Sequence, residues 1–93
     1  MVATQRPIGI FDSGVGGLTV FKEIRRALPG EDIIYLGDTA RVPYGIRSPE
    51  TVLKYATANT TFLLRRQVKL LVIACNTASA VAAGTLSRTY AMP

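Results

Sequence analysis

The sequence predicts an α/β fold, a three-layer α/β/α sandwich in which helices cover both faces of a short parallel sheet. Three observations predict it. Short apolar runs alternate with helical patterns, the runs are continuous rather than alternating, and each run stops at small polar residues. Continuous apolar runs are typical of parallel strands that are covered on both faces. The order is therefore βαβαβα, and we expect residues 1–93 to form a single unit.

The predicted strands are the three apolar runs. Each ends where residues suited to a turn or to chemistry begin, so each strand has a defined carboxyl end. The strands are expected over residues 8–11 (stopping at Asp12), 33–36 (stopping at Gly37 and Asp38) and 70–74 (stopping at Cys75).

The predicted helices follow the strands over residues 18–27, 49–67 and 76–86. In the first, apolar residues recur at spacings of three and four. The second begins at Ser48-Pro49-Glu50, because serine can cap a helix, proline suits its first position, and glutamate favours its positive end. Asn76 or Thr77 is expected to cap the third. Residues 90–93 resemble the approach to a fourth strand, so the sheet is expected to be incomplete.

Charge limits the classes of partner. The net charge is +5, but the basic residues are scattered along the chain. A nucleic-acid-binding protein would need a basic stripe interleaved with aromatic residues, so no nucleic-acid partner is predicted. The excess positive charge is compatible with an anionic small-molecule substrate.

Residue usage predicts the compartment and the cofactor class. The single cysteine allows no internal disulfide, which suits a reducing, cytoplasmic location. The N-terminus lacks the pattern of a signal peptide, and the longest apolar run is too short to span a bilayer, so no membrane partner is predicted. The chain has no histidine, the commonest metal ligand, so no metal site is expected.

The carboxyl ends of parallel strands are where ligands bind in such sheets. Right-handed crossovers bring all three ends to the same edge. The residues that would meet there are Asp12-Ser13, Gly37-Asp38-Thr39 and Cys75-Asn76-Thr77. A carboxylate and a thiol in one shared cleft indicate a chemical site.

The glycine-rich turn at residues 14–17 has two interpretations. A dinucleotide-binding fingerprint is one of them, but Thr19 occupies the third required glycine position, and Asp12 would repel a pyrophosphate. A tight strand-to-helix turn, with backbone close to a ligand or partner, is favoured instead.

Three candidate groups each keep two interpretations. Cys75 is either a buried, inert cysteine or a reactive thiol whose anionic form is favoured by the start of a helix. A nucleophilic cysteine normally needs a histidine, which is absent, whereas proton abstraction does not. Asp12 and Ser13 either cap the turn or supply a carboxylate that anchors an ammonium group or tunes a neighbouring acid or base. Pro43-Tyr44-Gly45 is either a plain turn or a carboxylate-binding backbone.

Three blocks, read in order, resemble glutamate racemase: FDSGVGGLTV (residues 11–20), YLGDTARVPYG (35–45) and IACNTASA (73–80). Related aspartate racemases resemble these blocks less. The resemblance implies a cofactor-independent enzyme that interconverts L- and D-glutamate and supplies D-glutamate for peptidoglycan, and hence for the cell wall and cell shape. It implies that Cys75 is catalytic and that Asp12 assists it and orients the substrate. The expected substrate-binding residues are Asp12, Ser13, Tyr44, Gly45, Asn76 and Thr77.

Inversion of a stereocentre without a cofactor needs a base on one face and an acid on the other, roles that two thiols can fill. This chain has one cysteine. The resemblance implies that the second lies in the other half of the family's fold. We therefore expect a truncated N-terminal segment, inactive alone, of an enzyme that is a homo-oligomer. The alternatives are a dicarboxylate-binding module, an interaction module that pairs through its open sheet edge, and an aspartate racemase.

Overall fold

The predicted βαβαβα order is present in the computed structural model, which describes residues 5–14, 16–41, 44–90 and 93. Two short 3-10 turns follow the second strand. The elements are β1 (Ile8–Asp12), α1 (Gly17–Ala27), β2 (Ile33–Gly37), η2 (Thr39–Arg41), η3 (Tyr44–Ile46), α2 (Pro49–Leu64), β3 (Leu70–Ile73) and α3 (Asn76–Tyr90). Val15, Pro43, Ala91 and Met92, which belong to the predicted turns and to the approach to a fourth strand, lie outside the described residues.

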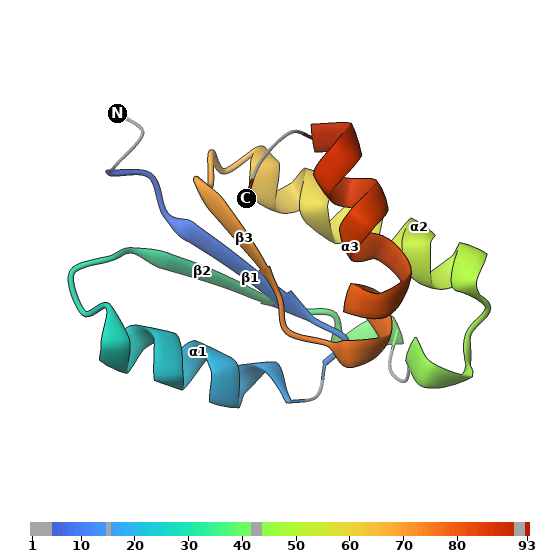
Figure 1. Cartoon of the computed structure of the whole chain (residues 1–93). Coiled ribbons are helices and arrows are strands. Elements are labelled where there is room, and N and C mark those ends of the chain that lie inside the picture. Colours follow the sequence, from blue (N-terminus) through green and yellow to red (C-terminus); the bar gives the residue numbers. More distant parts are fainter. Residues whose placement is uncertain (1–4, 15, 42–43, 91–92) are drawn as a thin grey trace.

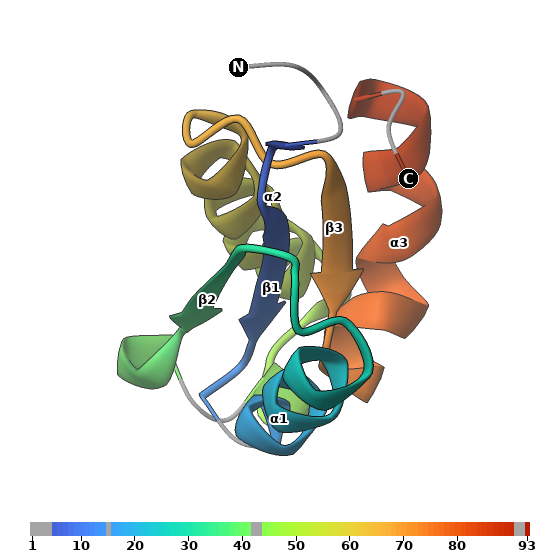
Figure 2. The same cartoon turned by 90° about the vertical axis from the view of Figure 1, so that its left-hand side faces the viewer.

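The sheet is parallel, with strand order β2-β1-β3, so β1 is central (Figure 2). Ile8 of β1 stands opposite both Ile33 of β2 and Leu70 of β3. At the other end of β1, Asp12 stands opposite Gly37, and Ala74 donates a hydrogen bond to the carbonyl of Phe11 at 2.8 Å. The three carboxyl ends therefore reach one edge of the sheet, as predicted.

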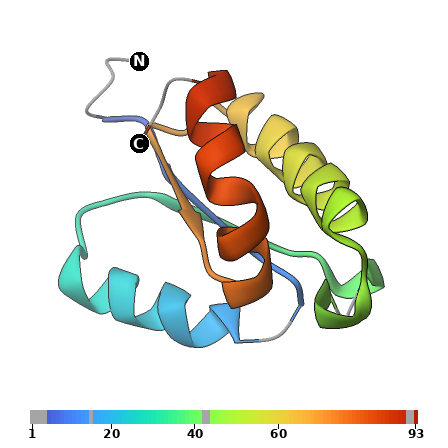
Figure 3. The same cartoon turned by 45° about the vertical axis from the view of Figure 1, so that its right-hand side comes forward.

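The helices form the two outer layers, which confirms the predicted sandwich. Helix α1 covers one face of the sheet, and α2 and α3 lie side by side on the other (Figures 1 and 3). Right-handed crossovers explain this placement, because β1-α1-β2 and β2-α2-β3 progress across the sheet in opposite directions. No helix of the described residues is long and apolar enough to span a membrane.

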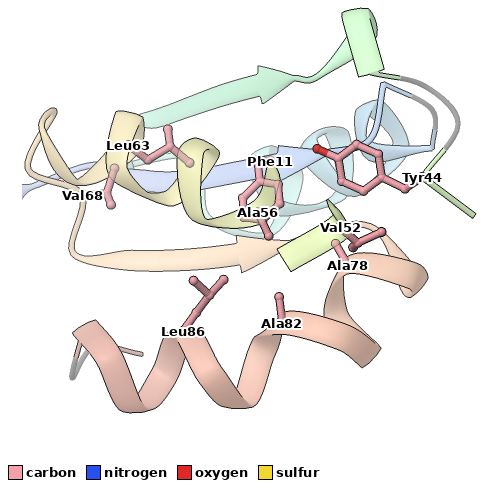
Figure 4. Packing of buried hydrophobic residues seen from close by; sticks show 9 residues of the cluster. All are labelled: Phe11, Tyr44, Val52, Ala56, Leu63, Val68, Ala78, Ala82 and Leu86. Carbon is pink, nitrogen blue, oxygen red and sulfur yellow. The ribbon is translucent and has the colours of Figure 1, made fainter. Parts of the chain in front are cut away.

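The main core lies between the sheet and the α2–α3 layer (Figure 4). Alanines 56, 78 and 82 are fully buried there, and their small side chains let both helices approach the strands closely. The buried cluster comprises Phe11, Tyr44, Val52, Ala56, Leu63, Val68, Ala78, Ala82 and Leu86. Among these residues, Tyr44 alone comes from the loop after β2, so the core also fixes that loop.

Helix α2 ends three residues before the predicted position. It stops at Leu64, and Gln67 has a φ of 61°, in the left-handed region. The amides of Arg66 and Gln67 donate to the carbonyls of Leu63 and Leu64, both at 2.9 Å, which makes a tight turn instead of another helical turn. Neither glycine nor proline marks this stop, so the sequence pattern extended the helix too far.

Strands β2 and β3 are the two edges of the sheet. Tyr90, which was expected to begin the approach to a fourth strand, is instead the last residue of α3. The carbonyl of Pro93 nevertheless accepts a hydrogen bond from the amide of Leu71 at 3.0 Å. The chain thus returns to the β3 edge at its described end.

Candidate active site

A hollow of about 410 Å³ lies at the carboxyl edge of the sheet, where the loops after the strands meet. Six of the seven predicted site residues line it: Ser13, Tyr44, Gly45, Cys75, Asn76 and Thr77. Gly16 and Ala74 also line it and were not predicted as site residues. From the loop after β2, Tyr44 and Gly45 line the hollow, whereas Asp38 does not. A second hollow, of about 230 Å³, lies between β3 and α3 and is lined mainly by apolar side chains, so it offers little chemistry.

Cys75 joins β3 to α3 and caps the helix. Its carbonyl accepts from the amide of Ser79 at 2.9 Å, and its Sγ accepts a weak hydrogen bond from the amide of Ala78 at 3.5 Å. The expectation that Asn76 or Thr77 caps α3 is therefore wrong, because both lie within its first turn. The free thiol is half-buried in the hollow, at the positive end of the helix dipole.

Asp12 is fully buried and holds the glycine-rich turn. Its Oδ1 accepts from the amide of Gly14 at 2.8 Å. Its Oδ2 accepts from the amide of Gly17 at 2.8 Å and from the Tyr35 hydroxyl at 2.7 Å. Gly14 and Gly16, with φ of 99° and 83°, supply the left-handed backbone that this turn needs. The turn-capping role left open by the sequence is thus present.

The carboxylate of Asp12 is not part of the lining of the hollow. Its contact with a substrate stays a prediction, while its turn carries Ser13 and Gly16 into the lining. Burial and the hydrogen bond to Asp12 raise the pKa of Tyr35 to about 12. Tyr35 therefore stays protonated at neutral pH and continues to donate to the carboxylate.

A polar cluster behind the hollow was missed from the sequence. The Tyr44 hydroxyl donates to Asp38, and the Asn59 amide donates to Tyr44 Oη at 3.0 Å and to Asp38 Oδ2 at 3.2 Å. Arg41 Nε lies 3.8 Å from Asp38 Oδ1. Burial and the bond to Asp38 raise the pKa of Tyr44 far above its ordinary value, so its hydroxyl remains a donor.

One signal in the sequence could have revealed Asn59. It stands on the apolar face of α2, in helical register with Val52, Ala56 and Leu63, all of which are buried. A polar side chain on such a face must find a partner, because an unpaired buried amide is costly. Its partners come from the loop after β2, and their position could not be read from the helix alone.

Within the described part of the chain, no group of three histidine, cysteine, aspartate or glutamate side chains could hold a metal ion. The hollow instead combines one thiol with hydroxyl and amide groups from Ser13, Thr77 and Asn76. Such groups can hold a polar substrate while a thiolate removes a proton from it.

Comparison with known proteins shows that the resemblance seen in the three motif blocks extends over most of this chain. No family model matches the chain. It is 64% identical over 88 residues to the glutamate racemase of Geobacter metallireducens and 59% identical over 86 residues to that of Aquifex aeolicus. These matches cover 95% and 92% of this chain, but 33% and 34% of the relatives. The chain thus spans about a third of the length of the curated relatives that it matches.

Solved structures agree with the sequence matches. The glutamate racemase of Thermus thermophilus, in complex with beta-chloro-D-alanine, is 53% identical with a TM-score of 0.91. That of Francisella tularensis, in complex with D-glutamate, is 50% identical with a TM-score of 0.89. Both matches cover 96% of this chain, and 35% and 34% of those chains. The resemblance to glutamate racemase over this third is therefore confirmed in both sequence and fold.

Proposed function

We propose that this chain, a homologue of about a third of glutamate racemase, supplies one of the two acid/base groups of such an enzyme. The observation that carries the proposal is the Cys75 thiol, which lines the hollow together with Ser13, Asn76 and Thr77. The 64% identity to the glutamate racemase of Geobacter metallireducens supports glutamate as the substrate. The D-glutamate complex of the Francisella tularensis relative supports the same choice.

In this mechanism the Cys75 thiolate removes the α-proton from one face of glutamate. The resulting carbanion receives a proton on the opposite face from a second thiol outside this chain, and the two groups exchange roles in the reverse direction. The proton removed by one thiolate and the proton delivered by the other thiol balance, and the family resemblance implies that no cofactor takes part. Ser13, Asn76 and Thr77 would bind the polar groups of the amino acid, together with the backbone of Tyr44 and Gly45.

Asp12 would serve this site through the turn that it holds. Because its oxygens already accept three hydrogen bonds, it would orient the substrate by fixing Ser13 and Gly16. The whole enzyme would be a cytoplasmic homo-oligomer that provides D-glutamate for peptidoglycan, as the family resemblance implies. A second candidate, dicarboxylate binding without turnover, is favoured for the isolated chain by its single cysteine.

A grafted racemase tests the proposal. The segment of the Geobacter metallireducens enzyme that matches this chain over 88 residues is replaced by the corresponding residues of this chain. We expect the graft to racemise glutamate, as followed by circular dichroism, because the hollow then faces the rest of the enzyme. The 93-residue chain alone is expected to give no turnover, because it offers a base to only one face of the α-carbon.

Two outcomes would contradict the proposal. A graft that folds, as its far-ultraviolet circular dichroism would show, but does not racemise glutamate would remove the assigned function. Turnover by the 93-residue chain as a strict monomer, established by sedimentation, would show that one thiol is enough. Turnover only by an assembled form would instead mean that a second copy supplies the opposing group.

A further inference from the structure

We infer that Asn59 is a positioning residue of this site, which sets the Tyr44–Gly45 wall of the hollow from behind and so governs substrate affinity. The inference rests on the proposed racemase function and extends it to a residue outside the three motif blocks. Asn59 belongs to α2, and it is not among the residues that line the hollow. Its effect must therefore pass through another side chain.

The contacts of Asn59 form a bridge between two loop residues. Its side chain is 7% exposed, and its Nδ2 donates to both Tyr44 Oη and Asp38 Oδ2, at 3.0 and 3.2 Å. Tyr44 also donates to Asp38, so the three side chains close a ring of hydrogen bonds. A buried ring of this kind specifies one arrangement, because a partly paired alternative leaves polar groups unsatisfied.

This ring of hydrogen bonds fixes the Tyr44–Gly45 wall of the hollow, because Tyr44 belongs to both. Tyr44 is 1% exposed, and its aromatic ring stands in the buried cluster (Figure 4), with its centroid 5.5 Å from that of the Tyr55 ring. The next residue, Gly45, lies against the first turn of α3, since a Cβ there would be 3.9 Å from Thr77 Oγ1. A displacement of the Tyr44 ring would therefore change the gap between Gly45 and Thr77, both of which line the hollow.

Loss of Asn59 is expected to change binding more than chemistry. The Cys75 thiol stands on a different connection, between β3 and α3, and the hydrogen bonds that join Asn59 to Tyr44 and Asp38 do not involve it. In the Asn59→Ala variant, Tyr44 keeps its bond to Asp38 and its packing against α2 but loses the hydrogen bond that Asn59 donates to its hydroxyl. The wall then samples positions that hold glutamate less well, while the thiol remains in place.

The test measures KM and kcat for glutamate in the grafted racemase. Asn59→Ala is expected to raise KM on the order of tenfold, the scale for one hydrogen bond to a charged group, with a much smaller fall in kcat. Thr60→Val is the matched control, because Thr60 is the next residue on α2, is fully buried, and has a hydroxyl without a hydrogen-bond partner among the described residues. Thr60→Val should leave KM unchanged.

A double-mutant cycle identifies the route of the effect. In a Tyr44→Phe background the hydroxyl that Asn59 holds is gone, so Asn59→Ala should add little to the rise in KM. Additive effects, or an unchanged KM in folded Asn59→Ala, would overturn the inference. Should Asn59→Ala not fold, Asn59→Ser must show the same rise in KM. A wild-type graft without activity would instead defeat the proposed function.

Discussion

Replacement of Cys75 by alanine is expected to abolish racemisation by the graft while leaving its fold intact. Among the described residues that line the hollow, the thiol is the acid/base group able to take a proton from carbon. Removal of a positioned acid/base group costs about 10²–10⁴-fold in rate. In a two-base mechanism the loss should reach the upper end, because one face of the α-carbon is left without a partner. Activity is measured by circular dichroism with both enantiomers.

The stability of the Cys75→Ala variant should change little. The side chain is half-buried and accepts a weak hydrogen bond from the amide of Ala78 at 3.5 Å. Loss of this cap is expected to cost about 1 kcal/mol or less of unfolding free energy. Cys75→Ser is the matched control, since its hydroxyl can still cap α3 but is a far weaker acid than a thiol. Full activity in Cys75→Ser would remove the thiol from the mechanism.

Replacement of Gly17 by alanine is expected to have the largest effect on stability. A Cβ at this position would overlap the carboxylate of Asp12. That carboxylate cannot withdraw without breaking its hydrogen bonds from Gly14, Gly17 and Tyr35. Hydrogen bonds to a charged group are worth about 1.5–3 kcal/mol each, so we expect a loss of at least about 3 kcal/mol. Urea unfolding of the 93-residue chain, followed by circular dichroism, measures it.

Gly84→Ala is the matched control for this prediction. Gly84 is an exposed residue within α3, and the nearest obstacle to a Cβ there is the flexible end of Arg88, whose Nη1 would lie 3.3 Å away. Alanine favours the helix over glycine by about 1 kcal/mol, so this variant should be more stable. Addition of the same methyl group is thus expected to lower the unfolding free energy at Gly17 and to raise it at Gly84. A neutral Gly17→Ala would mean that the Asp12 network does not hold the turn.

The sequence predicted the strands well because their signal is local. Each apolar run is bounded by turn residues, and its continuity indicates burial on both faces. The end of α2 was not predictable in the same way, because the turn that stops it is made by Gln67 in a left-handed conformation without glycine or proline. The cap of α3 was missed because cysteine is not among the usual capping residues, although the Sγ of Cys75 accepts the Ala78 amide.

The topology of the sheet predicted most residues that line the site, but it did not predict the contacts that hold those residues in place. Parallel strands bring Ser13 and Cys75 to one edge wherever the crossovers are right-handed, so their meeting was predictable. Whether Asp12 faces the cleft or the turn depends on Tyr35, which arrives from the neighbouring strand. The role of Asn59 depends in the same way on the loop after β2, which supplies its partner Tyr44. Both are long-range contacts, which local pattern does not encode.

Exchange of the glutamate α-proton with solvent deuterium tests the central claim most directly, since only proton abstraction at carbon releases it. The grafted racemase is incubated with L-glutamate in deuterium oxide, and the α-proton is followed by nuclear magnetic resonance. The account predicts that newly formed D-glutamate carries deuterium, while the remaining L-glutamate keeps its proton early in the reaction. Cys75→Ala should abolish formation of labelled D-glutamate. Glutamate that binds the graft but keeps both its α-proton and its configuration would contradict the account and leave a binding module.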